Sequence, residues 1–313
     1  MFLKYFIVEP WKRKSLATAF YRLCMVLHER TNGKFDIFYR KWAALIHPSR
    51  ELPQPEWLDN NTIDNIVVDL KNDGCRVLPV RLRPEEIKEV SDFAFSTPAY
   101  VKDPSEKIAI RANAIPTDFG RYTWPVQPLL QLKTVQRLMQ DSTLHRIAQS
   151  YLGAQCIVTS IILWITPTFT KEFAANIYHY DNDGPGFLKY FIYITDVEAD
   201  TGAHRFIKGT HHPVKPDAFK MSKRYDEDTL LNHFGVDKEI MFTAPAGTII
   251  AEDTAGFHRG GTVSRDYRLL MQLQYGLIDS PLDEEFMQKI HPVPLEGLDK
   301  RLARMTRKYF YSA

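Results

Sequence analysis

The chain has 313 residues, of which 44% are hydrophobic and 25% charged, and its formal net charge is +2. This is the composition of a soluble globular protein, and the near-zero net charge gives no general attraction to nucleic acid. No apolar run is long enough to cross a membrane. The three cysteines are far apart and lack metal-site spacing, and the start does not have the pattern of an export signal. We therefore expect a cytoplasmic protein.

The first sixty residues predict a helical extension and a linker. Residues 11–46 are predicted to be mostly helical, because five apolar residues fall at helical spacing: Leu16, Ala19, Phe20, Leu23 and Leu27. Residues 47–61 hold three prolines among polar residues and predict a linker. The apolar first ten residues and the cluster Lys12-Arg13-Lys14 would suit weak peripheral contact with the inner face of a membrane. We favour the alternative, in which the segment packs on the domain and its cations stay in solvent.

A compact unit of helices and one strand follows. The predicted elements are a helix from Ile63 to Leu70, a turn at Asp73-Gly74, a strand from Cys75 to Val80 and a helix from Pro84 to Phe95. Residues 96–128 contain five prolines and predict a long loop, which is either a lid or a surface crossing. Residues 129–152 are predicted to be helical again.

From residue 154 the chain changes to β-structure. Strands are predicted at residues 156–166, 187–195, 239–243, 247–251 and 268–277. These strands and the preceding helices predict a mainly β protein with flanking helices (α+β) and a sandwich or jelly-roll core. Residues 213–238 predict a polar, partly helical insertion. Residues 298–309 predict a basic helix with one apolar stripe.

His179 and Asp181 are the first sign of a metal site. A histidine and a carboxylate two residues apart supply two of the three ligands of a facial triad, which leaves open positions on Fe(II) for oxygen chemistry. Alone the pair is weak, since roughly one chain in two of this composition has one by chance. Asp183 would replace Asp181 in another strand register. Further along, His258 closes a short strand and turn, and Arg268 opens the next strand, where a guanidinium can clamp a carboxylate.

These residues belong to a longer order of motifs. In chain order it runs Asp73-Gly74, Val77-Leu-Pro79, Glu85-Glu86, His179-x-Asp181, Asp196-Val-Glu-Ala-Asp-Thr-Gly202, Gly209-Thr-His-His212, Ala246-Gly-Thr248, His258 and Arg268. Over about residues 62–278 this order resembles the phytanoyl-CoA dioxygenase family of Fe(II)- and 2-oxoglutarate-dependent oxygenases, and within it a bacterial subgroup.

The resemblance implies a double-stranded β-helix core, a cupin-like jelly roll, in which His179, Asp181 and His258 bind Fe(II). It implies that Arg268 holds the distal carboxylate of 2-oxoglutarate. The enzyme would use O2 to hydroxylate an unactivated C–H of a small-molecule, lipid or sugar-type substrate, and would release succinate and CO2. Related halogenases have a small residue where this chain has Asp181, so hydroxylation is favoured over halogenation.

The resemblance also divides the chain into three parts. Residues 1–61 would form the helical extension and linker, and residues 62–280 the oxygenase domain with its N-terminal helices. Residues 281–313 would form a basic helical tail packed on that domain. The basic helices at both ends would suit an anionic surface, but we favour two solvated helix faces.

Three more residues are candidates for contacting 2-oxoglutarate. Lys189 and Tyr193 share one strand face with Phe191, and Thr254 precedes His258. A lysine that points into a core needs an anionic partner, but Lys189 could equally reach solvent at a strand end. Arg259 and Arg265 are rivals of Arg268, which is preferred because it directly precedes an apolar strand.

Candidates for substrate contact come from the loops. Arg121 and Trp124 would touch a substrate if the loop at residues 96–128 were a lid. His204 and Arg205 either flank the pocket mouth or lie in a solvated turn. His211 and His212 are expected to be structural. The second functional hypothesis is a non-catalytic jelly roll that binds a carbohydrate or a partner protein.

Overall fold

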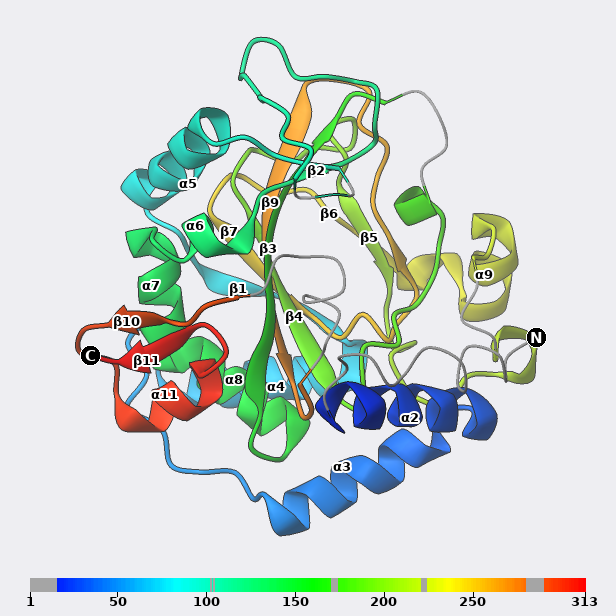
Figure 1. The fold of residues 1–313 in the computed structure, drawn as a ribbon. Coiled ribbons are helices and arrows are strands. Elements are labelled where there is room, and N and C mark those ends of the chain that lie inside the picture. Colours follow the sequence, from blue (N-terminus) through cyan, green and yellow to red (C-terminus); the bar gives the residue numbers. More distant parts are fainter. Residues whose placement is uncertain (1–15, 102, 104, 170–173, 221–223, 280–289) are drawn as a thin grey trace.

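The computed structural model describes residues 16–101, 103, 105–169, 174–220, 224–279 and 290–313 (Figure 1). One sheet contains β1 (Cys75–Arg81), β2 (Tyr122–Thr123), β3 (Ile157–Pro167), β4 (Phe187–Tyr193), β7 (Thr248–Glu252) and β9 (Tyr267–Gly276). A smaller sheet contains β5 (His204–Ile207), β6 (Glu239–Phe242) and β8 (His258–Arg259). Their strand orders are β1-β7-β4-β9-β3-β2 and β6-β5-β8, with antiparallel pairing throughout. With helices outside, this is an α+β architecture.

The central strands of the larger sheet, β4, β7 and β9, are buried on both faces, and β4 shows why. Leu188, Tyr190 and Ile192 point into the main core beneath the helices. Phe191 and Tyr193 point the other way and pack with residues of the smaller sheet. The predicted alternation along this strand is confirmed. The two apolar layers explain why the strand sequence is apolar on both sides instead of alternating with polar residues.

Helices cover the outer face of the larger sheet (Figure 1). They are α4 (Asn60–Asp73), α5 (Pro84–Ser96), α6 (Val126–Leu129), α7 (Lys133–Gln140) and α8 (Ser142–Leu152). The predicted helix–turn–strand–helix unit is confirmed. Helix α4 ends because Gly74 adopts φ 84°, a conformation that side chains disfavour. A Cβ at Gly74 would also lie 2.5 Å from the His211 ring, so the turn needs glycine for space as well.

The N-terminal extension is a hairpin of α2 (Leu16–Thr31) and α3 (Lys34–Ile46), broken at Asn32 and Gly33, which both have positive φ. The apolar stripe seen in the sequence is not the face that packs. Phe20 and Leu23 are 42% and 45% exposed, and the buried face of α2 is formed by Thr18, Tyr21, Cys24 and His28. From α3, Arg40 donates to the Pro185 carbonyl at 2.8 Å and lies 3.7 Å from Asp253. The first ten residues and Lys12-Arg13-Lys14 lie outside the described residues.

The C-terminal part folds back onto the helical layer. Parallel strands β10 (Val293–Leu295) and β11 (Phe310–Ser312) enclose α11 (Lys300–Thr306), which is shorter than the predicted helix at residues 298–309. The predicted apolar stripe is buried, as Leu298, Leu302 and Met305 join the main core. The insertion at residues 213–238 contains α9 (Glu227–Phe234). Within the described ranges, no helix is long and apolar enough to cross a membrane.

Candidate active site

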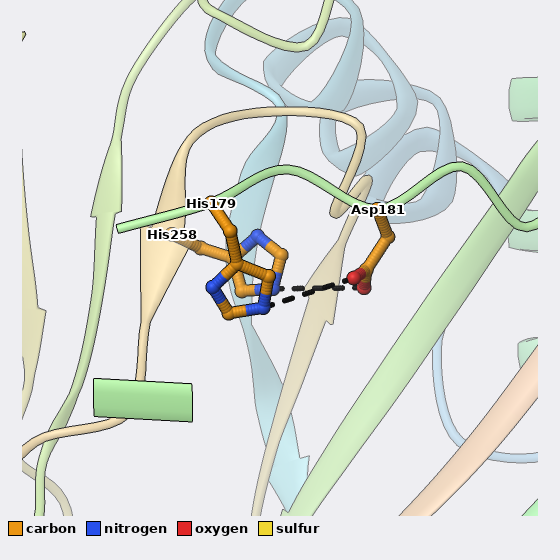
Figure 2. Close-up of side chains that lie close together, drawn as sticks. All are labelled: His179, Asp181 and His258. Carbon is orange, nitrogen blue, oxygen red and sulfur yellow. Dashed lines mark ion pairs between the residues drawn. The ribbon is translucent and has the colours of Figure 1, made fainter. Parts of the chain in front are cut away.

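A backbone ladder brings His179 and Asp181 beside His258. His179 N–H donates to the His258 carbonyl at 3.0 Å, His258 N–H donates back at 2.9 Å, and Asp181 N–H donates to the Thr254 carbonyl at 2.8 Å. The segment that carries His179 therefore runs antiparallel to β8, with the two histidines directly opposite. Figure 2 shows the three side chains pointing toward one another. One ligand atom of each lies within 4.8 Å of the other two.

Hydrogen bonds set the tautomer of both histidines. The Nδ1 atoms of His179 and His258 lie 2.9 Å from the carbonyls of Ile177 and Gly256, to which they must donate, because a carbonyl only accepts. In the neutral imidazole each Nε2 then carries the lone pair. The two Nε2 atoms lie 3.8 Å and 3.6 Å from the Asp181 carboxylate (Figure 2). Two oriented imidazole nitrogens and one carboxylate are the donor set of a facial metal site, so these residues fit Fe(II).

Lys189 bridges two carboxylates beside this cluster. Its Nζ lies 2.5 Å from Asp181 Oδ2 and 2.8 Å from Asp183 Oδ2, and its side chain is 7% exposed. Burial alone would raise the pKa of Asp181, but the Lys189 ammonium and the two imidazoles hold it well below its usual range. Burial would lower the pKa of Lys189, but both carboxylates raise it. This placement excludes the alternative in which Lys189 reaches solvent at a strand end.

His204 and Glu252 form a wall behind the cluster. The His204 ring stacks on the His258 ring, with centroids 5.5 Å apart, and its Nε2 lies 2.9 Å from Glu252 Oε1. Burial lowers the pKa of His204 to about 3 and raises the pKa of Glu252 to about 8. At neutral pH a protonated Glu252 therefore donates to a neutral His204. Of the two alternatives for His204, the solvated turn is excluded, because the residue is buried in β5, the middle strand of the smaller sheet.

Arg268 lies at the start of β9, where it pairs with Thr166 of β3. Its Nη1 donates to the Gly202 carbonyl, and its buried Nε has no hydrogen-bond partner. A Cβ built on Gly260, two residues after His258, would lie 3.6 Å from Arg268 Nη2, so the guanidinium reaches the chain segment that carries the ligand. Arg268 therefore has free donors beside the three-residue cluster.

The rival arginines already have carboxylate partners. Arg259 Nη2 lies 2.5 Å from Glu227, and the half-exposed Arg265 pairs with Asp200 at 2.8 Å and with Glu198 at 2.6 Å. Neither lines the cavity described next.

A cavity of about 280 Å³ lies between the two sheets and is shared by the cluster and Arg268. Its charged side chains are Arg121, Asp181, Asp183, Lys189 and Arg268. Apolar and polar residues of β3, β4 and β9 complete the wall, so the cavity can hold a small molecule with charged and apolar parts.

Four residues predicted to contact ligands do not line this cavity. Tyr193 is buried and donates to the Phe242 carbonyl at 3.0 Å, and Thr254 is buried beside the ligand segment. Trp124 is buried, and its indole N–H donates to the Thr97 carbonyl at 2.8 Å. Arg205 lies 3.0 Å from Glu239. Tyr193, Trp124 and Arg205 are thus paired away from the cavity, whereas the buried Thr254 hydroxyl has no hydrogen-bond partner among the described residues.

Of the candidate substrate residues, Arg121 and His204 do line the cavity. The loop residues His211 and His212 do not, and His211 Nε2 lies 3.2 Å from the Lys71 carbonyl.

Several lining residues went unnoticed in the sequence. Gln272 and Gln274 of β9 face the cavity, Ser160 of β3 pairs with Gln274, and Asn176 also lines the cavity. A signal was present, because the two amides alternate with the apolar residues Met271, Leu273 and Tyr275 in an otherwise apolar strand. Polar groups that point into a buried layer need a partner, so such a pair indicates a wet or ligand-bearing cavity.

No protein-family model matches the chain, and no curated protein matches its sequence. Solved structures do match its fold. The non-heme alpha ketoglutarate dependent epimerase SnoN from nogalamycin biosynthesis has a TM-score of 0.52 and 16% identity, over 71% of this chain and 84% of that chain. EctD from S. alaskensis with bound Fe has a TM-score of 0.50 and 19% identity, over 74% and 83%. The alpha ketoglutarate dependent carbocyclase SnoK has a TM-score of 0.50 and 15% identity, over 73% and 88%. The chain shares the fold of these non-heme enzymes.

Proposed function

We propose that the chain is an Fe(II)- and 2-oxoglutarate-dependent dioxygenase that hydroxylates an unactivated C–H of a small-molecule, lipid or sugar-type substrate. The observation that carries this proposal is the joint placement of the His179–Asp181–His258 cluster and the Arg268 guanidinium in one cavity. The likeness in fold to SnoN, SnoK and EctD supports it. The order of motifs further supports a jelly-roll core of the phytanoyl-CoA dioxygenase type.

Each residue has a role that its contacts suit. The Nε2 atoms of His179 and His258 and the Asp181 carboxylate would hold the metal. The backbone carbonyls behind both imidazoles keep the rings oriented, and Lys189 keeps the Asp181 carboxylate in place. Arg268 would bind the distal carboxylate of 2-oxoglutarate with its free N–H groups. When bound with O2, iron and 2-oxoglutarate supply the oxidant that takes hydrogen from a C–H, with release of succinate and CO2.

Hydroxylation is one of several outcomes that this fold hosts, since SnoN is an epimerase and SnoK a carbocyclase. The Asp181 carboxylate occupies the position that a halide would need, so the chain is proposed as a hydroxylase and not a halogenase. Product mass separates the outcomes. Hydroxylation adds one oxygen atom, ring closure removes two hydrogens, and epimerisation leaves the mass unchanged.

The proposal is tested by metal binding and by succinate release. The protein is supplied with Fe(II), 2-oxoglutarate and O2, and succinate is measured with and without a panel of small molecules. We expect His179→Ala to lose both iron binding and succinate formation. His212→Ala is the matched control, because that exposed histidine lies outside the cavity and should keep both. A wild-type protein that binds neither iron nor 2-oxoglutarate would instead favour the non-catalytic binding protein.

A further inference from the structure

Arg121 is a second cation in the cavity, and its position follows from strand register. Tyr122 pairs with Ile165, so Arg121 lies level with Thr166, which in turn pairs with Arg268. The two arginines therefore flank Thr166 on either side, on chain segments about 10 Å apart, which is twice the spacing of neighbouring strands. The Arg121 guanidinium lies over the Trp164 ring, 4.2 Å from its centroid.

Neither arginine is neutralised by the protein. Among the described residues Arg121 donates only from Nε, to the Thr123 hydroxyl at 3.3 Å, and it forms no ion pair. Burial among protein atoms lowers the pKa of Arg121 to about 10, as does the nearby Arg268 cation, so the group stays charged at neutral pH. Arg121 is partly exposed and lines the cavity without a protein carboxylate beside it, so its guanidinium is available to pair with an anionic ligand.

The cationic side chains that line the cavity outnumber the anionic ones. Lys189 is paired with the two carboxylates, Asp181 and Asp183, so that three cations face two anions. Fe(II) and the dianion of 2-oxoglutarate cancel each other. One positive charge remains. It belongs to Arg121, because Arg268 is the guanidinium proposed to bind 2-oxoglutarate.

An aromatic wall connects Arg121 with the metal cluster. The Trp164 ring meets the Phe191 ring edge-on at 6.5 Å, the Phe191 ring lies 4.9 Å from the His204 ring, and His204 stacks on His258. A molecule held at Arg121 would thus pack its body on Trp164 and Phe191 and extend toward the metal ligands.

We infer that Arg121 binds a singly charged oxyanion of the substrate, a carboxylate or a phosphodiester, whose apolar body lies on Trp164 and Phe191. This inference rests on the proposed function, because it assigns to 2-oxoglutarate the site at Arg268. It narrows the substrate to an acid and places the anionic group at the end of the cavity away from the reacting C–H.

The test uses Mn(II), which broadens the NMR signals of nuclei near it, together with saturating 2-oxoglutarate and no O2. The probes are acetate and dimethyl phosphate, with acetamide and trimethyl phosphate as uncharged counterparts. We expect one or both anions to be relaxed by the protein-bound Mn(II), and the neutral probes not. The anion that binds identifies the oxyanion as a carboxylate or a phosphodiester.

Variants then assign the effect to one residue. Arg121→Gln should weaken the binding of the anion by about tenfold or more and change the Kd of 2-oxoglutarate by less than about twofold. Arg121→Lys, which keeps the charge and the stem but loses the planar fork, should retain part of the binding. Arg265→Gln removes an exposed arginine outside the cavity and should change neither.

The inference would be overturned by unchanged anion binding in Arg121→Gln, by a loss of 2-oxoglutarate affinity in that variant equal to the loss in Arg268→Gln, or by equal relaxation of the neutral probes. If the wild type binds Mn(II) and 2-oxoglutarate but neither anion is relaxed, the inference about Arg121 is overturned and the proposed function is not. Failure of the wild type to bind Mn(II) and 2-oxoglutarate would overturn the proposed function as well.

Discussion

Lys189 Nζ lies 2.5 Å from Asp181 Oδ2, so a residue of the larger sheet holds the carboxylate of the metal cluster. The same ammonium group lies 2.8 Å from Asp183. One cation thus offsets the repulsion between two carboxylates that lie two residues apart in the same segment. It also leaves the second oxygen of Asp181 directed at His179.

Replacing Lys189 with Met should destabilise the metal-free protein by about 2 kcal/mol, because two partly buried carboxylates lose their shared partner. A divalent metal would then offset more of this repulsion, so Mn(II) should raise the Tm more in the variant than in the wild type. Thermal unfolding in EDTA and in Mn(II) measures both effects. Lys208→Met, which removes a more exposed lysine paired with Asp73, is the control. Identical metal-induced shifts in variant and wild type would contradict the prediction.

Replacing Arg268 with Lys should raise the Kd of 2-oxoglutarate by about tenfold or more, although the charge is kept. Lysine cannot present two parallel N–H groups, and the Gly202 carbonyl would lose its donor. Calorimetry with Mn(II) and no O2 gives this constant, and Arg265→Lys serves as the control. Equal constants for wild type and Arg268→Lys would show that 2-oxoglutarate binds elsewhere.

His145 should make the stability of the fold fall in mild acid. Its Nε2–H donates to the Met139 carbonyl at 2.9 Å, and its buried Nδ1 has no partner. Burial lowers the pKa of His145 to about 4, so from about pH 6.5 down to 4 the unfolded chain takes up a proton that the folded chain does not. Stability therefore rises with pH across this window.

On lowering the pH from 7.5 to 5, His145 should reduce the free energy of unfolding by about 2 kcal/mol. Urea unfolding at the two pH values measures the loss, and His145→Gln, which does not titrate, should show a smaller one. A loss of the same size in both proteins would assign the acid sensitivity to other groups.

Trp124 should matter for stability and not for ligand binding. Its side chain is buried in the main core and its indole N–H satisfies the Thr97 carbonyl. Trp124→Phe should therefore lower the free energy of unfolding by about 1–2 kcal/mol and leave the Kd of 2-oxoglutarate unchanged. A variant of normal stability with impaired ligand binding would restore the substrate role that its place in the loop suggests.

Strands and helices could be predicted from the sequence where a single pattern of apolar residues ran through the whole segment. The β-branched run at residues 156–166 and the alternation after residue 187 correspond to β3 and β4 within two residues. His258 and Arg268 could be singled out because each stands at a strand boundary. Their distance from His179 could not be predicted, since it depends on a ladder between segments that are far apart in the sequence.

Other features depended on contacts that a single sequence does not record. In α2 two different faces have enough apolar residues to pack. The parts of the protein around the helix bury Tyr21 and Cys24 and leave Phe20 and Leu23 exposed. His204 belongs to a strand of four residues, too short for its pattern to stand out. The role of Glu252 depends on His204, its partner across the two sheets.

The hydrogen bond from Arg40 to the Pro185 carbonyl, and the approach of Arg40 to Asp253, have a consequence for how the chain is made. The hairpin of α2 and α3 is synthesised before Pro185 and Asp253, which both follow it far along the chain. Until then the Tyr21 and Cys24 side of α2 can pack on Tyr39 and Ala43 of α3, but not on Ala154 and Ile278. The hairpin can therefore complete its docking only after residues as far along the chain as Ile278 have been made.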